Sequence, residues 1–193
     1  MKILLKITTL VGLTSVAAFA DATSDFVKFK TLAEQGDANA QANIASFYAQ
    51  GFGTPKNPQK ALEWAQKSAA QGDDIGLFNL GYFYVSGIGK KDMEKGVFSL
   101  TQAALKNHID ACKLLVSLYT NNQGAALTTP QGAMWAYIWT SVALGVENPN
   151  SPKVNTLQSK VKAMKAKVNL PEGPAAAMEA DIQRYIKLIK ESK

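Results

Sequence analysis

The amino-acid sequence predicts an all-α protein, an α-solenoid of stacked helix pairs, on three observations. A stretch of 20 residues recurs without a gap at an offset of 36, at 34–53 and 70–89, with eight identical positions. Apolar residues within both copies follow the three- and four-residue spacing of one helical face. No apolar–polar alternation of useful length indicates a β-strand. Repeats of this period are typical of helix pairs that stack side by side.

Residues 1–20 have the pattern of a secretory signal peptide. Lys2 and Lys6 precede an apolar run that ends in Ala18-Phe19-Ala20, the A-x-A pattern accepted by signal peptidase. The run is shorter than the ~20 residues of a membrane-spanning helix, so we expect cleavage after Ala20 rather than an anchor. The mature protein is then expected to be periplasmic or secreted.

The first full repeat illustrates how each helix pair is predicted. Residues 24–35 are expected to form a solitary helix that caps the start of the array. Ile44 and Tyr48 then share one face of the repeat's first helix, which Gly51 ends. The second helix begins at Asn57-Pro58, a capping side chain followed by a residue suited to the first helical position.

The rest of the chain is predicted to complete and close the array. A third, decayed copy begins near Asn107, and residues 136–144 take the place of its second helix. Two further helices follow within 151–193, with apolar stripes that would face the array. We therefore expect an array of about three repeats over 21–150 and basic capping helices over 151–193.

The repeated residues resemble the Sel1-like repeat family, a relative of the tetratricopeptide repeat. The pattern is G-D-x-x-A-Q, an apolar and a small residue, Tyr, G-x-G, K-A-x-x-W and A-A. The first copy supplies Gly36, Asp37, Ala40, Gln41, Ile44, Ala45, Tyr48, Gly51, Gly53, Lys60, Ala61, Trp64, Ala69 and Ala70. The resemblance covers roughly residues 33–145. It implies a right-handed superhelix that binds a protein or peptide partner, and it assigns structural rather than catalytic roles to the motif positions.

The sequence offers little for catalysis, so we expect no enzyme, no metal and no cofactor. His108, the single histidine, occupies the position of Asp37 and Asp73 and is expected to cap a helix. Cys112 is the single cysteine, which rules out an internal disulfide and favours a buried thiol. No triad, metal-ligand cluster or phosphate-binding glycine loop can be assembled.

The positive charge is concentrated near the C-terminus. The chain has a net charge of +6; residues 21–150 hold ten lysines against eleven acids, and residues 151–193 hold nine basic residues against four. Nearly all are lysines, so nucleic-acid binding, which favours arginine forks, is not expected. A basic ridge remains available for an anionic membrane or envelope polymer. Its residues are Lys160, Lys162, Lys165 and Lys167.

The favoured function is a monomeric, non-enzymatic protein–protein interaction adaptor or scaffold of the bacterial cell envelope, or a secreted one. The alternative is an accessory or regulatory protein that binds an anionic surface through the basic ridge. The predicted concave groove carries Asn39, Asn43, Asn79 and Tyr82. Asn43 and Asn79 are equivalent and would either hold a peptide backbone, through donor and acceptor, or bond within the array. Tyr82 replaces Ser46 of the first copy and is the expected hot spot.

Overall fold

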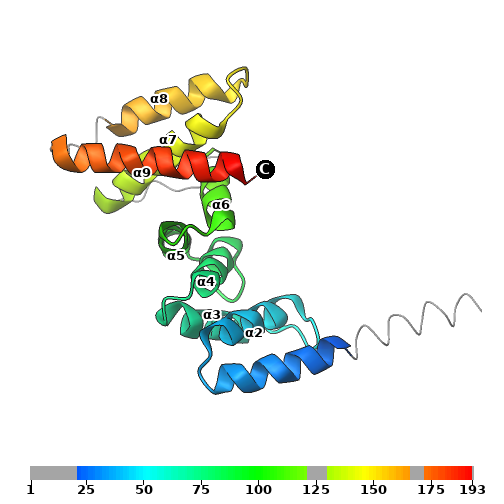
Figure 1. The fold of residues 1–193 in the computed structure, drawn as a ribbon. Helices are drawn as coiled ribbons and strands as arrows, with labels where there is room; N and C mark the ends of the chain where they lie inside the picture. Colours follow the sequence, from blue (N-terminus) through cyan, green and yellow to red (C-terminus); the bar gives the residue numbers. More distant parts are fainter. Residues whose placement is uncertain (1–20, 121–129, 166–171, 193) are drawn as a thin grey trace, which may run out of the picture. The chain divides into compact units, whose positions relative to one another are not determined.

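The structure is a computed structural model that describes residues 21–120, 130–165 and 172–192 (Figure 1). These residues form helices joined by turns and contain no strand, which confirms the predicted all-α class. Contacts divide the chain into two compact units, Met1–Lys91 and Asp92–Lys193. This division falls inside the predicted array of residues 21–150, and each unit is described separately below.

The first unit contains an N-terminal helix, both helices of the first repeat and the first helix of the second repeat. Residues 21–34 are helical, and three helices follow: α2 (Ala38–Gln50), α3 (Pro58–Ala70) and α4 (Asp74–Ser86). The helix α2 packs against both α3 and α4, and α3 packs against α4. The first helices of successive repeats, α2 and α4, are therefore neighbours, as the repeat predicts.

Caps define these helices at the predicted residues. The Asp37 side chain accepts the Ala40 backbone N–H at 2.7 Å, and Asp73 accepts that of Gly76 at the same distance. At its other end, α2 stops at Gly51, whose φ of 78° lies in the left-handed region. The Asn57 side chain then caps α3, where Pro58 takes the first helical position.

The N-terminal helix does take the place of a second helix before the first repeat. A Cβ on Gly53, at φ 64°, would collide with the Ala22 carbonyl oxygen. A Cβ on the equivalent Gly89, at φ 75°, would lie 2.8 Å from the Pro58 carbonyl oxygen at the start of α3. Ala22 and Pro58 are separated by the same offset of 36. Each repeat thus uses a glycine to approach the start of the preceding second helix.

The core of the first unit consists of the predicted face, with one exception. Ile44, Tyr48 and Tyr84 are buried. Trp64, whose place in the repeat pattern implies a core position, lies only half-buried at the edge of this core, with the Lys67 ammonium 4.2 Å above its ring. The indole therefore covers the edge of the core and remains partly exposed to solvent.

The second unit contains the remaining helices. They are α5 (Met93–Leu105), α6 (Ile109–Thr120), α7 (Pro130–Val146), α8 (Lys153–Lys165) and α9 (Glu172–Glu191). Both α8 and α9 pack against α7, and α6 packs against α5, α7 and α9. The Nδ1 atom of His108 accepts the Ala111 N–H at 3.3 Å, so this histidine caps α6 as Asp37 caps α2. Asn107, at φ 64°, replaces the left-handed glycine of the other copies.

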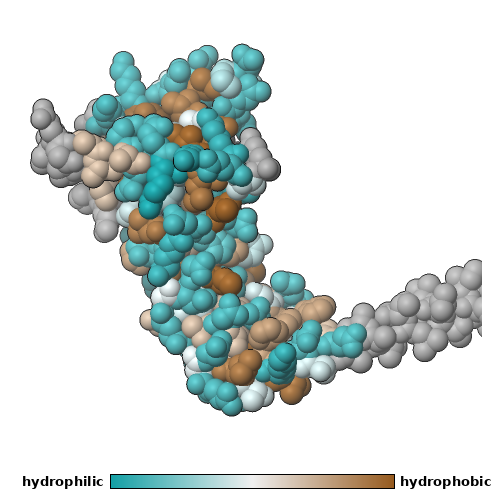
Figure 2. Space-filling model, viewed as in Figure 1, coloured by the Kyte–Doolittle hydropathy of each residue, from teal (hydrophilic) through white to brown (hydrophobic). Residues whose placement is uncertain are grey.

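A tryptophan on α7 organises the core of the second unit. Trp139 is fully buried, its ring centroid lies 4.8 Å from that of Tyr185 on α9, and its Nε1 donates to Thr101 Oγ1 on α5 at 3.3 Å. Figure 2 shows hydrophobic areas between hydrophilic ones on the visible face of both units. None of the described helices has the length and apolarity needed to cross a membrane.

Candidate functional site

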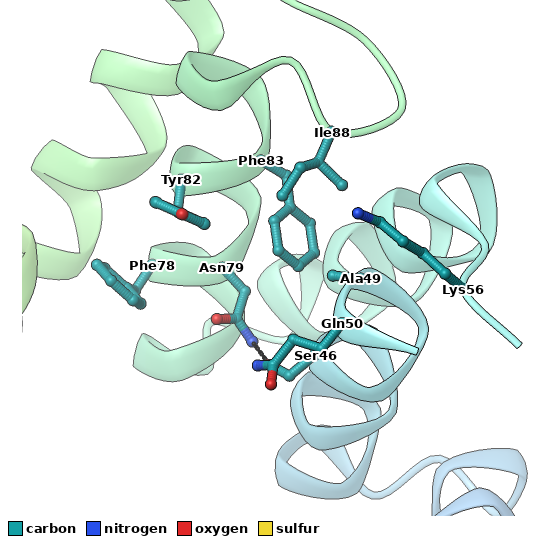
Figure 3. Close-up of a pocket in the computed structure, with 9 residues that line it drawn as sticks. All are labelled: Ser46, Ala49, Gln50, Lys56, Phe78, Asn79, Tyr82, Phe83 and Ile88. Atoms are coloured by element: carbon teal, nitrogen blue, oxygen red, sulfur yellow. Dashed lines mark hydrogen bonds between the residues drawn. The ribbon is translucent and has the colours of Figure 1, made fainter. Parts of the chain in front are cut away.

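A pocket of about 570 Å³ lies between α2 and α4 in the first unit (Figure 3). Its volume falls within the range of ligand-binding pockets. Nine residues line it: Ser46, Ala49, Gln50, Lys56, Phe78, Asn79, Tyr82, Phe83 and Ile88. Two of the four predicted groove residues, Asn79 and Tyr82, are among them.

The floor of the pocket is apolar. Ala49 near the end of α2 and Phe83 on α4 are buried, and Ile88, just after α4, is half-buried beside them. Ile88 is held there because its backbone N–H donates to the Phe83 carbonyl oxygen at 2.9 Å, in the turn that ends α4. The small Ala49 side chain leaves space above this floor, which an apolar side chain of a ligand would fill.

An aromatic pair forms one wall. Phe78 and Tyr82 are one helical turn apart on α4, and their rings stack with centroids 6.2 Å apart and an interplanar angle of 20°. Tyr82 is 42% exposed although it is a large aromatic residue. Figure 3 shows both rings on the side of α4 away from Lys56. The wall therefore presents a broad aromatic surface at the edge of the pocket.

Asn79 supplies one acceptor to the pocket. Its Nδ2 group donates to the Ala42 carbonyl oxygen at 2.9 Å and to Ser46 Oγ at 3.1 Å, both on α2. These two bonds use both amide hydrogens. Only Oδ1 remains for a ligand, and Figure 3 shows this oxygen on the side away from Ser46. Of the two roles expected for Asn79, the structure shows bonding within the array.

Lys56 supplies the charge of the pocket. Its side chain is exposed, and Figure 3 shows the ammonium group directed toward Phe83 and Ile88. The loop that carries it is fixed, because the backbone N–H of Asn57 donates to the Tyr48 carbonyl oxygen at 2.8 Å. Lys56 is the one charged residue among the nine that line the pocket.

Asn39 and Asn43 lie on α2 outside the lining of the pocket. Asn43 donates to the carbonyl oxygen and to Oδ1 of Asn39, both at 2.9 Å. Asn79, its equivalent on α4, instead bonds across to α2. The difference arises because α2 is the first of its kind in this unit, so no earlier first helix stands beside Asn43. Of these two equivalent asparagines, Asn79 therefore bonds to the neighbouring helix of the array, whereas Asn43 bonds within its own helix.

Sequence reasoning missed the charge and most of the apolar lining. Phe83 is identical to Phe47 at the offset of 36, and Ile88 corresponds to Phe52, so the repeat contained a signal for both. Lys56 corresponds to Lys91, since each directly precedes the residue that caps the second helix, but the loop length differs between the copies and so the repeat gave no signal that Lys56 lines a pocket.

The basic ridge of the second unit is only partly described. The half-buried Lys160 directs its Nζ atom toward the Tyr119 carbonyl oxygen at 3.5 Å, near the end of α6. Lys162 and Lys165 are exposed on α8, and Lys167 lies outside the described residues. Lys160 therefore points partly into the fold rather than standing out as a ridge.

The residues considered for catalysis lie in surroundings that do not activate them. Cys112 is fully buried on α6, and burial raises the pKa of its thiol to about 11. The thiol is therefore protonated at neutral pH, whereas a nucleophilic cysteine needs a thiolate. Among the described residues, no group of three or more histidine, cysteine or acidic side chains is arranged to hold a metal ion.

Two units of packed helix pairs, with matching caps and glycines in successive copies, define a helical repeat protein. Residues 38–73 and 75–108 match the Sel1 repeat, which confirms the predicted resemblance over these residues. The predicted third copy falls mostly outside these matches.

The chain is similar to three known proteins. A putative sel1-like repeat-containing protein of Acanthamoeba polyphaga mimivirus is 46% identical over 48 residues, which are 25% of this chain and 8% of that protein. A protective antigen of uropathogenic Escherichia coli strains, described as displaying an SLR fold, is 25% identical over 85% of this chain, with a TM-score of 0.51. A Sel1 repeat protein from Oxalobacter formigenes is 23% identical over 69% of this chain and 60% of its own, with a TM-score of 0.46.

The chain spans 8% of the viral protein and 33% of the antigen. These likenesses concern the repeats and the fold. Proteins with Sel1 repeats generally act as adaptors in protein interactions, and their fold is typically non-catalytic.

Proposed function

We propose that this chain is a non-enzymatic interaction adaptor that receives a peptide segment of a protein partner in the pocket between α2 and α4. The observation that carries the proposal is the apolar floor of Phe83, Ile88 and Ala49, open to solvent beside the exposed Tyr82. Binding hot spots combine an apolar pocket with an exposed aromatic residue. The general role of Sel1 repeat proteins supports the same function.

The lining of the pocket suits binding rather than acid–base chemistry. The nine residues include no histidine, cysteine, aspartate or glutamate. General acid–base catalysis commonly uses such groups, in pairs whose protonation states differ. What the pocket offers is an aromatic wall, an amide acceptor and one ammonium group, which together favour a segment with both apolar and polar parts.

We propose further that the adaptor works outside the cytoplasm, in the periplasm or after secretion. The support is the sequence of residues 1–20, with Lys2 and Lys6 before an apolar run and the A-x-A pattern at 18–20. Intact mass spectrometry of the protein recovered from the producing cells tests this. A mature N-terminus at Asp21 is expected, and a protein that retains Met1 would contradict export.

The binding function is tested by crosslinked capture of partners on the purified protein, followed by affinity measurement with the partner identified by mass spectrometry. Tyr82→Ala is expected to weaken binding by ~1–3 kcal/mol, because it removes the aromatic wall while leaving the floor intact. Phe52→Ala is the matched control, since Phe52 is also an exposed aromatic residue of this unit, 49% exposed, and does not line the pocket.

Thermal melting of both variants checks that the fold is retained. Equal affinity for the wild type and Tyr82→Ala, or an equal loss in Phe52→Ala, would place the partner elsewhere on the molecule.

A further inference from the structure

We infer that the pocket recognises a peptide segment in which an aspartate or glutamate neighbours a large apolar residue, with Lys56 binding the carboxylate. The inference rests on the proposed function, because it specifies the chemistry of the segment that the pocket would receive. Three features of the lining carry it: an unbalanced positive charge, an apolar floor, and amide oxygens of Asn79 and Gln50 that can accept a backbone N–H.

The charge of the pocket is positive and uncompensated by its own lining. Lys56 is its one charged residue, and no acidic side chain lines the pocket. Within the described part of the chain, Lys56 forms no ion pair, whereas Lys30 of the same unit pairs with Glu34 at 3.7 Å. A carboxylate brought to this ammonium group beside apolar side chains would gain more from the interaction than one in open water.

Other lysines of the unit are engaged differently. The Lys60 ammonium lies 5.3 Å from the centre of the Tyr48 ring, and that of Lys67 lies 4.2 Å from the Trp64 ring. Both therefore face aromatic side chains outside the pocket. Lys56 is directed toward Phe83 and Ile88 at the floor (Figure 3). An anion that contacts Lys56 would consequently lie next to the space where an apolar side chain fits.

The apolar and polar parts of the lining explain why the ligand is a peptide. Asn79 Oδ1 is an acceptor that a backbone N–H satisfies, while its amide hydrogens are bound to Ala42 and Ser46. The space above Ala49 and beside Phe83 takes an apolar side chain. A peptide supplies a backbone donor, an apolar side chain and a carboxylate within neighbouring residues, which matches the lining in all three respects.

Selection of phage-displayed random peptides on the intact protein tests the inference. The wild type is expected to enrich peptides with Asp or Glu beside Leu, Ile, Phe, Tyr or Trp. Lys56→Glu should replace the acidic residue by Lys or Arg in the enriched sequences. Lys91→Glu is the matched control, since Lys91 follows Gly87 at the end of α4 as Lys56 follows Gly51, is exposed, and does not line the pocket. This control should select the same peptides as the wild type.

Titration of one selected peptide and its amide analogue, Glu→Gln or Asp→Asn, then measures the preference. The wild type and Lys91→Gln are expected to bind the acidic peptide about two- to fivefold more tightly, the modest range of an exposed ion pair. Lys56→Gln should remove this difference. Peptides without acidic residues, or equal losses in Lys56→Gln and Lys91→Gln, would overturn the inference.

Two further outcomes separate this inference from the proposed function. Selected peptides that lose affinity in Tyr82→Ala but show no acidic preference would leave the adaptor pocket in place and overturn the carboxylate contact alone. Peptides that bind equally well to Tyr82→Ala, or no selected peptide at all, would count against both. Binding to phosphatidylglycerol vesicles that disappears in Lys56→Gln would identify a lipid surface instead of a peptide and overturn the inference as well.

Discussion

Trp64 in the first unit and Trp139 in the second occupy the same position of the repeat but have different surroundings. Trp64 is half-buried at the edge of its core, under the Lys67 ammonium. Trp139 is fully buried, contacts Tyr185 of α9 and donates a hydrogen bond to Thr101. The repeat thus specifies which helix carries the indole, whereas the helix packed against it afterwards decides whether the indole is buried.

The same contrast separates the packing of the two units. In the second unit, α9 covers α7 and closes the core. In the first unit, α2 and α4 leave an open pocket between them.

The largest expected effect is on the second unit's tryptophan. Trp139→Ala should lower the free energy of unfolding by ~3–5 kcal/mol, because it empties a closed core and leaves the Thr101 hydroxyl without this partner. Trp64→Ala should cost about 1–2 kcal/mol, since its indole is already partly hydrated. Urea denaturation followed by circular dichroism measures both. Equal losses in the two variants would mean that the packing of α9 against Trp139 adds no stability, which would contradict the contrast between the two tryptophans.

Alkaline pH should also act on the second unit. Burial raises the pKa of Cys112 from 9.0 to about 11 and that of Tyr119 from 10.0 to about 12. Above pH 9 the unfolded thiol loses its proton while the folded thiol keeps it, so the unfolded state is favoured. The free energy of unfolding should therefore fall as pH rises from 9 to 11, by up to about 3 kcal/mol for Cys112.

Denaturation curves at pH 8 and at pH 10 measure this fall. Cys112→Ala is the control that isolates the cysteine, because Tyr119 is present in both proteins and contributes to both in the same way. A variant that loses as much stability at pH 10 as the wild type would show that the buried thiol is not the cause.

The smallest expected effect compares two equivalent asparagines of the first unit. Asn79→Ala should cost about 1–3 kcal/mol, since it removes two hydrogen bonds from the buried Asn79 side chain to α2. Asn43→Ala should change stability by less than about 0.5 kcal/mol, because its bonds to Asn39 lie on the surface. Thermal melting of the two variants measures the difference. A cost as small for Asn79 as for Asn43 would show that the bonds to α2 contribute little.

Repeat equivalence predicted the local structure well. Asp37 and Asp73 cap helices as expected, and His108 does so at the same position despite its different chemistry. Each of these features depends on a few neighbouring residues, which the sequence shows directly. The Trp64 environment could not be predicted in this way, because it depends on which helix packs next.

The candidate site was predicted only in part, for a similar reason. Tyr82 stood out because its size differs from that of Ser46 at the equivalent position. The bonds of Asn79 to α2 and the direction of the Lys56 side chain depend on how two helices and a loop meet in space. The same holds for Lys160, whose contact with Tyr119 joins residues on α8 and α6. Such tertiary contacts are not encoded in any single stretch of the sequence.

The buried thiol gives the molecule a built-in probe of its own fluctuations. Cys112 is the single cysteine of the chain, so a thiol reagent labels one position and reaches it only when the surrounding helices transiently separate. The labelling rate of the unmodified protein therefore reports the free energy of that opening in the second unit. A peptide held between α2 and α4 will leave the rate unchanged if the two units behave independently. A slower rate would reveal that occupation of the pocket is transmitted to residues beyond Asp92.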